Sequence, residues 1–101
     1  LGGAGAADYR SVIISTTGAA KITVLALSSN VSTGREAVLK KVADDSQIGD
    51  TVIVYGDYGK GDNGKGLTGS FTYIVEGAGD YYFASLEGGI NIYAIIVEPL
   101  E

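Results

Sequence analysis

Residues 69–97 read GSFTYIVEGAGDYYFASLEGGINIYAIIV, and this stretch decides the fold class. It contains three short runs rich in Phe, Tyr, Ile and Val, separated by Gly77-Ala78-Gly79 and Gly88-Gly89. β-Branched and aromatic residues suit the pleated surface of a sheet, and short glycine-rich gaps suit tight hairpin turns with positive φ. The stretch therefore predicts three consecutive strands, at Gly69–Glu76, Asp80–Leu86 and Ile90–Glu98.

The same pattern continues towards the N-terminus, where Thr17-Gly18 is a further candidate for a tight turn. Four more strands are expected, near Ser11–Ser15, Lys21–Ser28, Arg35–Val42 and Thr51–Tyr55. Residues 35–42 (REAVLKKV) contain good helix formers, but the run is short and a lone helix would need an apolar stripe to dock, so a strand is favoured. We predict an all-β fold, an antiparallel, jelly-roll-like β-sandwich of seven to eight strands, in a single domain spanning residues 1–101.

The last run, Ile90–Val97, is apolar on nearly both faces, which is typical of a central strand in a sandwich. Asn91 and Tyr93 are two residues apart and share one face of it, and the residues expected on the other face are Ile90, Ile92 and Ala94. We expect a buried Asn91 amide that holds a neighbouring backbone, with the Tyr93 ring packed beside it. Three other tyrosines are expected to pack in the core or at its rim with hydroxyls reaching water: Tyr73, Tyr81 and Tyr82.

Composition and charge exclude several classes of function. The 101 residues include 12 acidic and 7 basic side chains, giving a net charge of −5, which argues against nucleic-acid binding. No apolar run approaches the ~20 residues of a membrane-spanning helix. The absence of His and Cys removes the commonest general base, nucleophile pair and zinc ligands. No spacing suggests two catalytic carboxylates, since Asp44 and Asp45 read as turn residues before Ser46. A non-enzyme is therefore predicted, in a piece of a longer protein.

A glycine-rich loop at residues 56–66 (GDYGKGDNGKG) matches G-x-x-x-x-G-K through Gly59, Gly64 and Lys65. A phosphate-binding loop needs Ser or Thr next and a helix after it. Here Gly66 and a strand follow instead, so the match is rejected.

Three interpretations of this loop stay open. It is a long hairpin loop without a ligand, a calcium site, or a platform for a ligand. Calcium prefers oxygen ligands, which Asp57, Asp62 and Asn63 would supply, and no other cofactor is suggested by the sequence. A platform would use Tyr55 and Tyr58, because sugars present C–H faces that stack on aromatic rings and hydroxyls that bond to polar neighbours.

Residues 18–35 (GAAKITVLALSSNVSTGR), 77–97 and 1–14 resemble the non-catalytic β-sandwich modules that lie beside pectate lyases of gut and rumen anaerobic bacteria. The shared features are a K-I-T-V-x-A-x-S-S strand followed by a polar turn and an Arg, and a later G-I-N-I-Y-x-I strand. The pectin-binding family 77 modules are the nearest functional analogy.

The resemblance implies an extracellular, monomeric carbohydrate-binding module, covalently linked to a catalytic domain, that targets this enzyme to plant cell-wall polysaccharide. Pectin is the favoured ligand, with β-glucan or mannan as alternatives, and neither nucleic acid nor membrane is a partner. Basic contacts to galacturonan would come from Arg10 and Arg35, with these lysines as helpers: Lys21, Lys40, Lys41, Lys60 and Lys65. An acidic domain repels an acidic polymer unless its cations gather on one face or calcium bridges the two.

Other interpretations remain beside this one. The two arginines could instead form surface or edge ion pairs. The whole chain could be a structural spacer or a protein-interaction module of a multi-domain extracellular enzyme, which predicts an exposed apolar or edge-strand patch.

Overall fold

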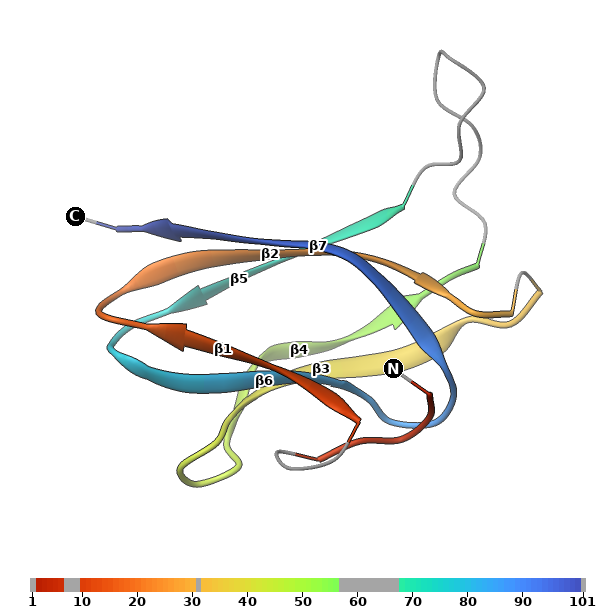
Figure 1. Cartoon of the computed structure of the whole chain (residues 1–101), viewed down its shortest axis with the longest axis horizontal. Coiled ribbons are helices and arrows are strands. Elements are labelled where there is room, and N and C mark those ends of the chain that lie inside the picture. The colour runs from red at the N-terminus through yellow and green to blue at the C-terminus, as the bar shows by residue number, and fades with distance from the viewer. Residues whose placement is uncertain (1, 7–9, 31, 57–67, 101) are drawn as a thin grey trace, which may run out of the picture.

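The computed structural model describes residues 2–6, 10–30, 32–56 and 68–100, and these ranges contain seven strands and no helix able to cross a membrane. The strands are β1 (Ser11–Thr16), β2 (Ala20–Ser28), β3 (Arg35–Lys41), β4 (Gln47–Val54), β5 (Gly69–Val75), β6 (Gly79–Ser85) and β7 (Ile90–Pro99). They form a four-stranded sheet in the order β1-β6-β3-β4 and a three-stranded sheet in the order β5-β2-β7, packed as two layers (Figure 1). The neighbouring strands are antiparallel, so the predicted all-β sandwich is confirmed.

The core forms between the two layers because β2 alternates strictly. Its side chains at Ile22, Val24 and Ala26 have no exposed surface, whereas the residues between them are only half-buried. From the opposite layer β6 contributes Tyr81 and Phe83 to the same cluster. The Phe83 ring meets the ring of Tyr73 edge-on at a centroid distance of 6.4 Å, an arrangement that favours aromatic pairs.

Residues 35–41 form a strand, as predicted. They begin the β3–β4 hairpin, which is the only connection among the described strands that stays within one sheet. The turn is held by Asp44, whose carboxylate accepts hydrogen bonds from the backbone N–H of Ser46 at 3.0 Å and from its hydroxyl at 2.7 Å. Asp45 adopts a φ of 62°, which Asp tolerates better than most residues. The prediction that both aspartates are turn residues is thus confirmed.

Strand β4 begins at Gln47, four residues before the expected start at Thr51. The register of β3 against β4 shifts between Ala37 and Leu39, which marks a bulge, and Gly49 in this part of β4 has a φ of 66°. Gly49 and Asp50 are poor strand formers, and for this reason the pattern alone hides the first half of β4.

The glycine turns at residues 17–18, 77–79 and 88–89 are not hairpins, contrary to prediction. Each joins a strand of one sheet to a strand of the other, because only β3 and β4 are neighbours in both chain and sheet. Of these glycines only Gly79 has a positive φ, at 154°. Gly88 is needed for another reason: a Cβ there would collide with the guanidinium of Arg35. Turn residues mark where the chain reverses, but not whether it reverses within a layer or across it.

Strand β7 lies at the edge of the three-stranded sheet, so the prediction of a central strand is wrong. Its inward side chains Ile92 and Ile95 pack partly against the core, but Ile96 and Val97 remain 44% and 41% exposed. An apolar edge strand shows the same sequence pattern as a central one. What distinguishes them is whether a neighbouring strand exists, and the pattern of one strand does not contain that information.

The three predicted packing tyrosines are all buried, as expected, and the hydroxyls of two of them form hydrogen bonds within the protein. The Tyr81 hydroxyl donates to the Gly77 carbonyl at 2.9 Å and closes the β5–β6 corner, as tyrosine corners do in immunoglobulin-type sandwiches. The Tyr82 hydroxyl donates to the Asp45 carboxylate. The Tyr73 hydroxyl is buried with no partner among the described residues, and burial raises the pKa of this phenol to about 12.

These two core tyrosines give a matched test. Tyr73→Phe removes a buried hydroxyl that gains no hydrogen bond, so the free energy of unfolding should rise by about 1 kcal/mol. Tyr81→Phe removes a hydroxyl that is bonded to the Gly77 carbonyl, so the free energy of unfolding should fall by about 1 kcal/mol. Urea unfolding of both variants measures the difference. Equal losses in the two would contradict the assignment of Tyr73 as an unpaired group.

Candidate functional site

The outer side of the three-stranded sheet is a regular surface on which the residues of β2 are half-buried rather than enclosed. Its middle is set by the half-buried residues of β2, each flanked in register by one residue of β5 and one of β7. Lys21 lies between Ile74 and Glu98, and Thr23 lies between Thr72 and Ile96. We call this surface the outer face; its residues are Lys21, Thr23, Leu25, Leu27, Ser70, Thr72, Ile74, Asn91, Tyr93, Ala94, Ile96 and Glu98.

Tyr93 lies at a bulge in β7. Leu25 pairs with Ala94 and Ala26 pairs with Ile92, so Tyr93 is an extra residue without a partner in β2. Such a bulge places two successive residues on one side of the strand, and the alternation from Asn91 puts Tyr93 on the outer side. The Tyr93 side chain is 61% exposed, the highest value among the described large apolar residues.

The expectation that Asn91 and Tyr93 are buried together is therefore wrong, since both are exposed. Ala94 is expected from the sequence on the other side of the strand from Tyr93. It pairs instead with Leu25 and lies on the outer face with Tyr93. The bulge explains the position of Ala94, because one inserted residue inverts the alternation beyond it. The signal in the sequence was a Tyr and an Asn sharing one side of an otherwise apolar strand.

The dimensions and chemistry of the outer face suit an extended ligand. From Lys21 to Leu27 the face is about 20 Å long at the usual rise per strand residue, and its three strands make it about 10 Å wide. Aliphatic side chains and the Tyr93 ring alternate with hydroxyls, for example at Thr23 and Thr72. The surface can thus offer apolar contact and hydrogen bonds along one line.

Two of the predicted ligand-binding residues, Arg35 and Tyr55, are brought together at one end of the sandwich. The Arg35 guanidinium donates through Nη1 to the Ser29 hydroxyl and to the Gly89 carbonyl, both at 2.8 Å. It therefore ties the β2–β3 connection to the β6–β7 connection, and no ion pair joins it to an acidic side chain among the described residues. The Tyr55 ring is 51% exposed and packs over Gly34, where a Cβ would lie 2.9 Å from its Cδ1.

Arg10 lies just before β1 with a φ of 50°, and its guanidinium packs against Gly3. The other predicted site residues lie outside the described residues: Asp57, Tyr58, Lys60, Asp62, Asn63 and Lys65. In the part of the chain that the structure describes, no group of three acidic, His or Cys side chains could hold a metal ion. The calcium and platform interpretations of this loop therefore remain predictions.

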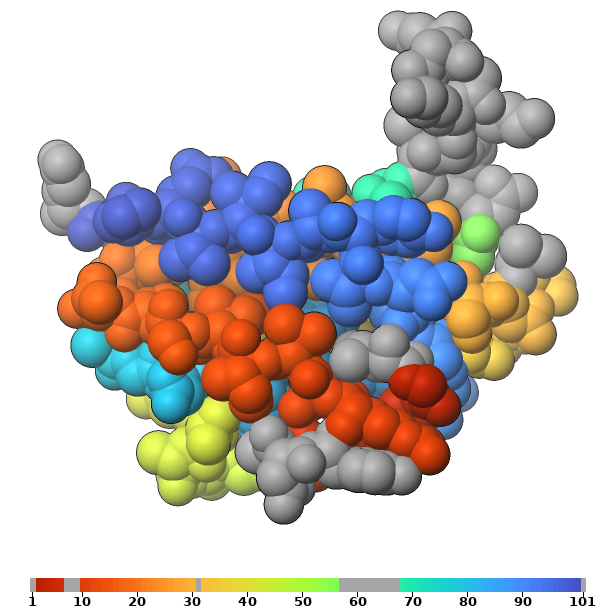
Figure 2. All heavy atoms as spheres, in the orientation of Figure 1, coloured from red at the N-terminus to blue at the C-terminus, as the bar shows by residue number. Residues whose placement is uncertain are grey.

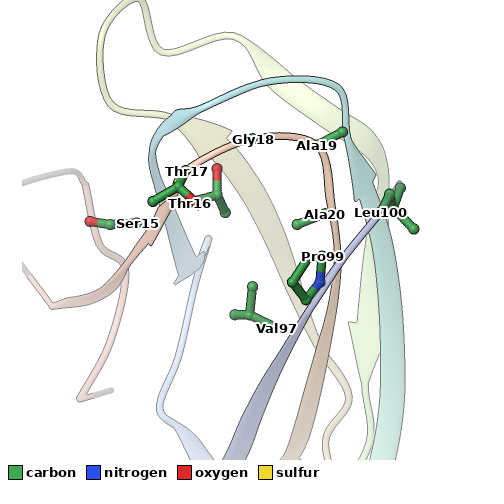
Figure 3. Close-up of a pocket in the computed structure, with 9 residues that line it drawn as sticks. All are labelled: Ser15, Thr16, Thr17, Gly18, Ala19, Ala20, Val97, Pro99 and Leu100. Carbon is green, nitrogen blue, oxygen red and sulfur yellow. The ribbon is translucent and has the colours of Figure 1, made fainter.

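A second surface is the open side of the sandwich where β1 and β7 are the edges of their sheets; Figure 2 looks onto it, with β7 in blue and β1 in orange. At one end of this side a shallow hollow of about 310 Å³ lies between the start of β2 and the end of β7 (Figure 3). Its lining is Ser15 to Ala20, Val97, Pro99 and Leu100. These residues carry no charge, so the hollow has apolar surface and hydroxyls but no acid or base.

A third group, Lys40, Asp45 and Tyr82, lies on the outer side of the four-stranded sheet. Lys40 forms a 3.4 Å ion pair with the exposed Asp45 carboxylate. The hydrogen bond from Tyr82 holds the pKa of Asp45 below its usual value, and Lys40 lowers it further. Burial, reinforced by the bond to Asp45, raises the pKa of Tyr82 to about 12. This group fastens the β3–β4 turn to β6. Its three polar side chains bond to one another, with the Asp45 carboxylate accepting from Tyr82 and Lys40.

Comparison with known protein families and with curated proteins found no match to this chain. The functional interpretation therefore depends on the geometry and chemistry of these surfaces.

Arg35→Ala should lower the free energy of unfolding by about 1.5–3 kcal/mol, because it removes the charged donor that joins two connections. Arg35→Lys should recover only part of the lost stability, since an ammonium lacks the planar fork of the guanidinium. Thermal unfolding of both variants is the measurement. A fully stable Arg35→Ala variant would contradict the structural role of this residue.

The Asp45–Tyr82 pair predicts a defined pH dependence. Because the pKa of the Asp45 carboxyl is lowered in the folded protein, this group stabilises the fold at pH values above the ordinary pKa of Asp. The stabilisation is lost as the pH falls through the lowered pKa. Because the pKa of the Tyr82 phenol is raised, this group stabilises the fold at pH values below the ordinary pKa of Tyr. That stabilisation is lost as the pH rises through about 12. In Tyr82→Phe the pKa of Asp45 should rise towards its ordinary value, as followed by carboxyl NMR titration. A larger rise in Lys40→Gln than in Tyr82→Phe would contradict the ranking of the two partners.

Proposed function

We propose that this chain is a non-catalytic carbohydrate-binding module that holds a plant cell-wall polysaccharide on its outer face. The observation that carries the proposal is the exposed Tyr93 ring, which lies beside a bulge on a three-stranded surface that also carries hydroxyl and amide side chains. The plant cell wall, the extracellular setting and the appended enzyme are suggested by the resemblance to pectate-lyase-associated modules.

The chemistry of a sugar polymer fits this surface in two ways. The C–H face of one sugar can stack on the Tyr93 ring, and the aliphatic side chains of Leu25 and Ile96 continue the apolar contact. Sugar hydroxyls can exchange water for Thr23 and Thr72, whose side chains stand beside one another across β2 and β5. Each contact is weak, so the module would act by keeping an attached enzyme close to its polymer and raising its effective concentration.

A second candidate function is protein interaction, and the edge position of β7 favours it. No described strand pairs with β7 along the edge that faces away from β2. An exposed apolar edge of this kind can accept an added strand. Val97 points towards the core side yet remains 41% exposed beside the hollow. An extended segment of a partner protein could pair with β7 and cover Val97.

Tyr93→Ala should weaken binding to a soluble plant polysaccharide by about tenfold or more, because truncation of an aromatic anchor typically costs over 1 kcal/mol. Tyr55→Ala is the matched control, since it removes another exposed tyrosine ring from the opposite layer. Affinity electrophoresis in polysaccharide gels and calorimetry measure both variants, and circular dichroism checks their folding.

Loss of binding in Tyr55→Ala with full binding in Tyr93→Ala would move the site to the end of the sandwich that holds Arg35. Binding of the wild-type protein to no polysaccharide would contradict the proposal. If the protein then pairs with a partner segment and Val97→Lys abolishes that pairing, the second candidate function is correct.

A further inference from the structure

We infer that the polymer held on the outer face is an uncharged polysaccharide, such as a β-glucan or a mannan, rather than galacturonan. The inference rests on the proposed function and specifies the class of its ligand. It follows from where the charged side chains of the described residues lie, and not from the net charge alone.

The outer face itself carries balanced charge. Its one cation, Lys21, stands directly opposite its one anion, Glu98, across the β2–β7 ladder. Both lie at the end of the face towards β5–β6, where the exposed Glu76 follows β5 and adds a second anion nearby. The rows at Thr23, Leu25 and Leu27 contain no charged residue. A galacturonan carries a carboxylate on each sugar, and this face offers no series of cations to receive them.

The remaining described cations are dispersed over other parts of the molecule. Arg35 is committed to the Ser29 hydroxyl and the Gly89 carbonyl, and Arg10 precedes β1 in the other layer. Lys40 pairs with Asp45 on the outer side of the four-stranded sheet, and Lys41 lies at the end of β3. An acidic domain with a net charge of −5 needs its cations gathered on one surface to attract an acidic polymer, and these cations are not gathered.

The shape of the face agrees with an uncharged linear polymer. At about 20 by 10 Å it accommodates one extended chain running along the strands, with Tyr93 and Ile96 on the β7 side and Thr72 and Ser70 on the β5 side. For such a ligand the affinity comes from apolar contact and neutral hydrogen bonds. Both are nearly independent of ionic strength, whereas attraction between charges is screened by salt.

The test compares three soluble polymers with the wild-type protein: mixed-linkage β-glucan, glucomannan and polygalacturonate. Affinity electrophoresis and calorimetry are run at about 20 mM and about 300 mM NaCl, with and without calcium. We expect binding to a neutral polymer that changes less than twofold with salt and is lost in Tyr93→Ala. As a control on the other sheet, Lys41→Gln at the end of β3 should change the affinity for the neutral polymer less than twofold.

Each other outcome overturns a distinct part of the account. Preferential binding to polygalacturonate, weakening with salt or requiring calcium, would overturn the inference of a neutral ligand while leaving carbohydrate binding in place. Neutral-polymer binding that persists in Tyr93→Ala would overturn the assignment to the outer face. Binding to none of the three polymers would overturn the inference together with the proposed function.

Discussion

Every second side chain of β2 is enclosed between the two sheets, and Ile22, Val24 and Ala26 have no exposed surface. A shift of β2 by one residue would carry this whole row to solvent, so its register is strongly fixed. Because β2 pairs with β5 on one side and β7 on the other, its register also fixes which residues of those strands face outwards. Burial of one side of β2 thus determines the composition of the outer face.

Both candidate surfaces of the proposals involve β7, which lies at the edge of its sheet. Tyr93 lies on the outer face beside a bulge in this strand, and no described strand pairs with the other side of β7, where Val97 is exposed beside the hollow. The opposite layer is different, since the outward-facing Tyr82 is buried and bonded to Asp45. The proposed recognition therefore concerns the three-stranded sheet and its edge, and the absence of charged residues at the centre of that sheet supports the proposed class of ligand.

Local chemistry predicted much of this fold. Runs of β-formers located all seven strands, and the adjacent aspartates located the β3–β4 turn, because these features depend on residues close together in the chain. Pairing between distant segments was not predictable in this way. The glycine turns cross between layers, β7 is an edge, and the bulge at Tyr93 arises from its register against β2. For the site, sequence placed Arg35 among ligand contacts, whereas tertiary structure engages its guanidinium with Ser29 and Gly89.

The most direct test of recognition by the outer face is to map backbone amide shifts in a ¹⁵N-labelled protein during titration with a soluble neutral polysaccharide fragment. The account predicts that the largest shifts cluster on three adjacent strands, at Thr23, Leu25, Thr72, Ala94 and Ile96, while the amides of Arg35, Tyr55 and Gly89 stay in place. Shifts confined to the end of the sandwich around Arg35 and Tyr55, with none on β2 and β7, would contradict it.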